Sequence, residues 1–119
     1  MKNRTSTATE TSTATAPICW QREAPSACLR IELLNGEIHL FPYPHLAAAR
    51  LTRIGEESET LHLTFSTHEI QIEGHNLRDL VLGIQDFAIK WLRAVPERFR
   101  AVATIRDGMI SNIRIASMN

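Results

Sequence analysis

The stretch that decides the fold begins at residues 29–41, which read LRIELLNGEIHLF. Apolar and polar residues alternate on both sides of Asn35-Gly36, a dipeptide that favours a two-residue hairpin turn because both central positions need a positive φ. With this dipeptide as the loop, Ile31 faces Leu40 on an apolar face. The pattern predicts an antiparallel hairpin with one buried face and one solvated face.

A second alternating run at residues 61–73 predicts another hairpin. With Thr67-His68 at its tip, Phe65 faces Ile70, and the apolar residues again share one face. This turn chemistry is weaker than that of Asn-Gly because neither residue favours a positive φ, so a longer loop stays an alternative.

Apolar residues then recur at helical spacing through residues 77–95. Asn76 is suited to cap the start of this helix, and Pro96 bounds its end because proline disfavours the α conformation of the preceding residue. The sequence therefore predicts an α+β fold. A curled antiparallel β-meander of about four to six strands packs against one long α-helix that follows the main strands.

Two segments are harder to assign. Residues 45–54 contain an alanine run typical of a helix, yet the short distance to the next strand favours a strand, which is our interpretation. Beyond Pro96, the dipeptide Asp107-Gly108 resembles a hairpin turn, but neither face of the flanking residues is cleanly apolar. Residues 97–119 are therefore expected to form no more than a short strand or hairpin.

Length and composition predict one small domain at residues 18–119. Residues 1–17 repeat the motif TSTAT without a large apolar residue, so we expect a disordered tail. The spacing of Cys19 and Cys28 matches no metal motif and favours free thiols in a reducing cytoplasm. No apolar run reaches transmembrane length, so a cytoplasmic protein without a membrane partner is expected.

The chain lacks an assembled catalytic motif. His62, His68 and His75 invite a metal hypothesis, but their spacing is unlike that of a structural zinc site. The single glycines form no phosphate-binding loop, and no serine or cysteine stands next to a base. We therefore expect no catalytic residue, no metal ligand and no cofactor, and a protein that is not an enzyme. A small hydrolase or metal protein with a site assembled from distant residues stays an alternative.

The predicted helix carries more apolar surface than one sheet face needs. Leu82 and Ile89 are seven residues apart and lie off the main apolar stripe. They are either covered by the C-terminal segment or exposed to a partner. The formal net charge of +0 does nothing to keep copies apart. The preferred functional hypothesis is therefore a protein interaction or assembly module that forms a homo-oligomer, with Leu82 and Ile89 at its interface.

Nucleic acid is the alternative partner. Arginines are concentrated toward the C-terminus, and a guanidinium is a good phosphate ligand. Residues 29–36 and 72–77 also have short apolar strands ending in glycine that resemble the Sm-like RNA-binding barrel, although that family places its helix before the strands. No site is transferred from this resemblance. The arginines expected to contact nucleic acid in this alternative are Arg98, Arg100, Arg106 and Arg114.

Overall fold

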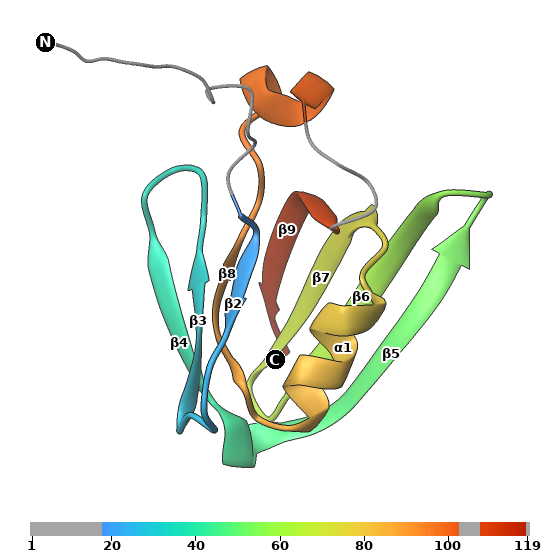
Figure 1. Ribbon diagram of the computed structural model, residues 1–119. Helices are drawn as coiled ribbons and strands as arrows, with labels where there is room; N and C mark the ends of the chain where they lie inside the picture. Colours follow the sequence, from blue (N-terminus) through green and yellow to red (C-terminus); the bar gives the residue numbers. More distant parts are fainter. Residues whose placement is uncertain (1–17, 103–107, 119) are drawn as a thin grey trace, which may run out of the picture.

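The computed structural model describes residues 18–102 and 108–118. Within these residues the chain forms two four-stranded sheets, which do not close into a barrel, and one α-helix (Figure 1). The predicted α+β class is therefore confirmed, whereas the single curled meander and the long helix are wrong. The predicted tail, residues 1–17, lies outside the described residues. No helix in the described part of the chain is long and apolar enough to cross a membrane.

The first sheet combines strands from distant parts of the sequence. Its β3–β8 pair is parallel, and its other two pairs are antiparallel. The strand order is β2 (Trp20–Arg22), β8 (Ile89–Arg93), β3 (Cys28–Glu32) and β4 (Ile38–Pro42). This arrangement makes β2 and β4 the edges of the sheet.

The second sheet is antiparallel throughout and has longer strands. Its order is β5 (Leu46–Ile54), β6 (Ser58–Phe65), β7 (His68–His75) and β9 (Met109–Ser117). The helices are α1 (Arg78–Gln85) and the 3-10 turns η1 (Tyr43–His45) and η2 (Glu97–Val102). In Figure 1, α1 lies beside β5, and η2 lies at the opposite end of β8 from α1.

Both sheets and α1 contribute to one hydrophobic core. The two-residue periodicity of the strands sends alternate side chains inward, and α1 adds residues at helical spacing. The fully buried aliphatic side chains include Leu29, Ile31, Leu61, Leu63, Ile70, Ile72, Leu77, Leu80, Ile89 and Leu92.

The first predicted hairpin exists as β3 and β4, but its predicted register is wrong by one residue. Leu29 faces Phe41, and Ile31 faces His39 rather than Leu40. The reason is the turn: Gly36 alone has a positive φ, at 97°, and its N–H donates to the carbonyl of Leu33 over 3.0 Å. The loop is therefore a three-residue turn that ends in a glycine bulge, rather than the two-residue turn expected.

This one-residue change in register exchanges the buried and exposed faces of β4. Phe41 enters the core, whereas Ile38 and Leu40 point to solvent with 61% and 62% of their surface exposed. Side chains alternate along a strand, so a shift by one exchanges its two faces.

The second hairpin, β6 with β7, differs from its predicted register by two residues, and Leu63 faces Ile70. A shift by two leaves the faces unchanged, so its predicted buried face is confirmed.

The predicted helix over residues 77–95 is wrong in its second half. α1 ends at Gln85, and Phe87 adopts a left-handed conformation with φ 56°. The N–H of Ala88 donates to the carbonyl of Gly83 over 2.8 Å, and the N–H of Phe87 donates to that of Ile84 over 3.0 Å. These two bonds form a Schellman motif, which ends the helix and turns the chain into β8.

The start of α1 also differs from the prediction. Asn76 has φ 56° and is not the N-cap, and Leu77 at that position supplies no capping side chain. The carboxylate of Glu59 on β6 instead accepts the N–H of Leu77 over 2.7 Å. A residue from the sheet therefore stabilises the positive end of the helix.

The two segments that were hard to assign are both strands in part. Residues 46–54 form β5, as predicted. β9 has nine residues, longer than the short terminal strand expected, because it pairs along most of β7. Asp107 lies outside the described residues. The two cysteines are free thiols, as expected.

Tyr43 anchors η1 to the first sheet. Its side chain is 2% exposed, and its hydroxyl donates to the carbonyl of Ile89 over 2.6 Å. Burial raises the pKa of Tyr43 to about 12, because the phenolate cannot be hydrated there. This residue is the only tyrosine in the sequence, so its titration can be observed directly.

We expect this raised pKa to make the protein less stable in alkali. Below the ordinary pKa of about 10 the tyrosine is neutral in both states, and its contribution is complete. Between pH 10 and 12 the unfolded chain ionises first, so the free energy of unfolding should fall by about 2–3 kcal/mol in total. Urea melts across this range, with Tyr43→Phe as the reference, measure the effect. A phenolate absorbance change centred near pH 10 in the folded protein would contradict it.

Candidate functional site

A groove lies between the helix and the edge of the second sheet. It has a volume of about 360 Å³ and is lined almost entirely by apolar side chains. The small residues Ala47, Ala48 and Ala49 form its β5 wall, and Val81 and Phe87 stand on the α1 side. Because the alanines are short, the backbone of β5 is accessible along this wall.

β5 is an edge strand nine residues long. It pairs with β6 on one side, and no described strand lies on its other side. The backbone N–H and C=O groups that point outward from such an edge are free to pair with another strand. β5 contains neither lysine nor proline. Its exposed charges are Arg50 and Arg53, and its register with β6 shifts between Leu46 and Ala48.

Phe87 occupies a position where the backbone favours glycine. It is the residue after the C-cap in the Schellman motif, and its φ of 56° is costly for a bulky side chain. Its ring contacts Tyr43 at a centroid distance of 5.1 Å, yet 47% of the residue is exposed. A strained, half-exposed aromatic residue at the mouth of an apolar groove is a typical feature of a binding surface.

The two predicted interface residues do not share a face. Leu82 lies on α1 with 40% of its surface exposed, next to Val81 of the groove. Ile89 lies in β8 and is fully buried in the core. Of the predicted pair, only Leu82 is therefore exposed in this structure, because the helix ends four residues before Ile89.

The three described arginines of the nucleic-acid alternative lie on η2 and β9. Arg100 is used internally: its Nε donates to the carbonyl of Val95 over 3.4 Å and its Nη2 to that of Ser111 over 2.7 Å. Arg98 is exposed on η2, Arg114 lies on β9, and Arg106 lies outside the described residues. Of the three described arginines, Arg100 is therefore held by backbone carbonyls and Arg114 by the Glu73 carboxylate.

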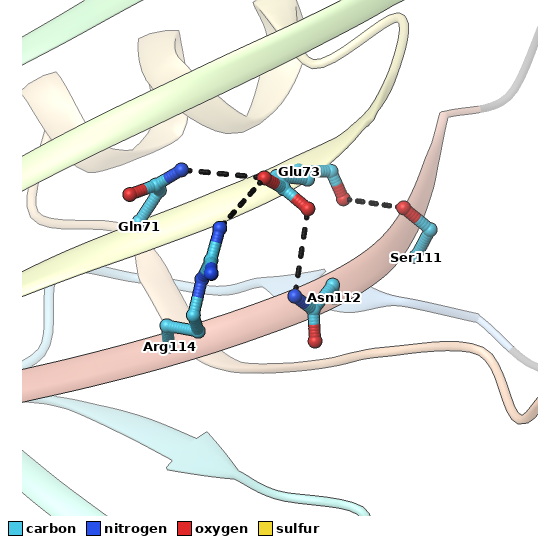
Figure 2. A network of polar contacts seen from close by, with 5 residues as sticks. All are labelled: Gln71, Glu73, Ser111, Asn112 and Arg114. Atoms are coloured by element: carbon cyan, nitrogen blue, oxygen red, sulfur yellow. Dashed lines mark hydrogen bonds and ion pairs between the residues drawn. The ribbon is translucent and has the colours of Figure 1, made fainter.

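Arg114 belongs to a polar network on the outer face of the second sheet (Figure 2). The carboxylate of Glu73 on β7 accepts hydrogen bonds from Gln71 over 3.2 Å, Asn112 over 3.4 Å and Arg114 over 3.1 Å. The hydroxyl of Ser111 donates to the Glu73 carbonyl over 3.1 Å. These bonds join β9 to β7, so the network holds an edge strand in place.

The histidines form no metal centre in the described part of the chain. Within residues 18–102 and 108–118, no three His, Cys, Asp or Glu side chains gather closely enough to hold a metal ion. The Nδ1 of His75 contacts the Glu57 carbonyl at 2.7 Å, and that of His68 contacts the Thr67 hydroxyl at 2.7 Å. The His68 contact is local to the β6–β7 turn, whereas the His75 contact joins the end of β7 to the β5–β6 turn.

Cys19 is held in the core. Burial raises the pKa of its thiol, and the hydrogen bond from the Ile110 N–H to Sγ, over 3.2 Å, partly opposes this rise. A thiol with a raised pKa carries little thiolate at neutral pH and is a poor nucleophile. Cys19 therefore acts as a packing residue.

Sequence reasoning missed the groove and the role of Phe87. The alanine run at residues 47–49 was visible, but its position beside a helix end depends on tertiary contacts. No family model, curated protein or solved structure matches the chain.

Proposed function

We propose that the protein is a self-associating interaction module, in which two copies pair through their β5 edges. The observation that carries this proposal is the open nine-residue edge of β5 beside the apolar groove. A strand added to this edge gains backbone hydrogen bonds, and its side chains gain the apolar surface of Val81 and Phe87.

A second copy fits this surface better than an unrelated strand does. Two antiparallel β5 strands related by a two-fold axis at Ala48 would place alanines opposite alanines, so both backbones can approach closely there. The same operation would set the two α1 helices on one side of a continuous eight-stranded sheet. Phe87 of each copy would then lie near the groove of the other. The formal net charge of +0 adds no long-range repulsion.

A lysine within the alanine wall of β5 should dissociate the pair. Ala48 is exposed and faces Thr64 of β6, so Ala48→Lys leaves the core intact. In the dimer it would place like charges opposite each other and raise the dissociation constant by about tenfold or more. Sedimentation equilibrium measures the constant, and a melting curve at low protein concentration checks the fold.

The matched control is Ala116→Lys, which makes the same change on β9, the other edge of the same sheet. It should leave the dimer unchanged. A second variant, Phe87→Gly, relieves the positive φ and should weaken association without loss of fold. A wild-type protein that stays monomeric at millimolar concentration would rule out the proposal, and so would dissociation by Ala116→Lys alone.

A further inference from the structure

A second groove lies far from the β5 edge, between the tip of the β3–β4 hairpin and η2. It has a volume of about 280 Å³. Its walls are apolar except for three charged residues. The lining residues are Glu32, Leu33, Leu34, Arg93, Ala94, Pro96, Arg98 and Phe99. The exposed leucine at the hairpin tip and the half-buried phenylalanine of η2 give the groove its apolar surface.

Both arginines of this groove are held by aromatic rings. The Cζ of Arg93 lies 4.6 Å from the ring centroid of Trp91, and that of Arg98 lies 4.8 Å from the ring of Phe99. Stacking of this kind orients a guanidinium and leaves N–H groups at its edge to donate. Arg93 uses its Nε for the carbonyl of Ile18, over 3.1 Å, so its terminal nitrogens stay available.

Neither guanidinium is neutralised by a described carboxylate. Glu32 faces Arg93 in the register of β3 and β8, but its carboxylate pairs with Nε of Arg30 at 2.8 Å. Within the described residues, no Asp or Glu lies within ion-pair distance of Arg93 or Arg98. The charged lining residues are two arginines and one glutamate, which leaves a single net positive charge.

We propose that this groove binds an organic carboxylate with a compact apolar group. The two guanidiniums receive the carboxylate through charge-assisted hydrogen bonds, and the apolar group lies against Leu33, Leu34 and Phe99. One net positive charge suits a monoanion. Both the terminal residue of a peptide and a free carboxylic acid have this chemistry.

The test uses N-acetylphenylalanine as the probe and its amide as the neutral counterpart. In a titration of ¹⁵N-labelled full-length protein, the carboxylate should shift the amide signals of Leu33, Leu34 and Phe99. The neutral amide should bind about tenfold or more weakly because it lacks the charge. Arg98→Gln should weaken carboxylate binding by a similar factor, whereas the control Arg78→Gln, an exposed arginine of α1, should leave it unchanged.

Octanoate distinguishes the two sources of the carboxylate. Binding as tight as that of N-acetylphenylalanine supports a free carboxylic acid, whereas weaker binding supports a peptide terminus. The proposal is overturned if the amide binds as well as the carboxylate, or if Arg98→Gln has no effect. It is also overturned if the shifts lie elsewhere, or if no saturable shift appears at millimolar probe. Since the β5 edge lies outside this groove, these results do not depend on self-association.

Discussion

Gly74→Ala is expected to lower the free energy of unfolding by about 3 kcal/mol, because overpacking against backbone cannot be relieved by a rotamer change. Gly74 lies in β7, where the register with β9 shifts. A Cβ at this position would overlap the carbonyl oxygen of Met109 and lie 3.0 Å from the Cα of Ile110. The neighbouring Ser111 is anchored by Arg100 and by the Glu73 carbonyl, so β9 cannot move away freely.

Gly55→Ala is the matched control for this substitution. Gly55 has φ 79° and no atom within 4 Å of the added Cβ, so only conformational strain is expected there, about 1 kcal/mol. Urea melts of both variants distinguish the cost of steric overlap with β9 at Gly74 from the cost of backbone strain at Gly55. A Gly74→Ala protein as stable as Gly55→Ala would show that β9 lies farther from β7 than described.

Ile89→Ala is expected to lower the free energy of unfolding by about 3 kcal/mol, whereas Leu82→Ala should lower it by less than about 1 kcal/mol. Ile89 is fully buried, and its side chain packs against Gly83, where an added Cβ would meet Ile89 Cδ1. Alanine would therefore leave a cavity between α1 and β8. Leu82 is already 40% exposed, so its truncation removes little buried surface.

Melts of these two variants should be made at low protein concentration, so that self-association does not contribute. Equal losses for Leu82→Ala and Ile89→Ala would indicate that α1 continues through residue 89, as the helical spacing predicted. The described structure requires a large difference between the two substitutions.

The structure predicted from the sequence is wrong where local conformational preference and tertiary strand pairing disagree. Residues 88–95 satisfy a helical period, yet Ile89–Arg93 is also a good strand sequence because of its branched and aromatic residues. Pairing with β2 and β3 decides in favour of the strand. The capping of α1 shows the same limit, since Glu59 lies 18 positions before Leu77 in the chain.

The candidate sites depend on tertiary structure even more strongly than the fold does. The alanines of β5 and Phe87 of the helix end are separated by about forty positions, and only chain folding places them along one groove. Helical periodicity correctly predicted that Leu82 lies on the helix, because α1 includes that residue. Ile89 was misassigned because the same periodicity was extended past the Schellman motif.

The sequence by itself determined the α+β class, the two hairpins and the buried face of β6 and β7, because period-2 patterning and turn residues act locally. The strand over residues 46–54 followed only from the short distance to the next strand. Only the tertiary structure decided which face of β4 is buried. Because the loop has one more residue than predicted, Phe41 lies in the core in place of Leu40. It also decided the end of α1 and the division into two sheets. Those features depend on burial and strand pairing between distant segments, which local preferences do not specify.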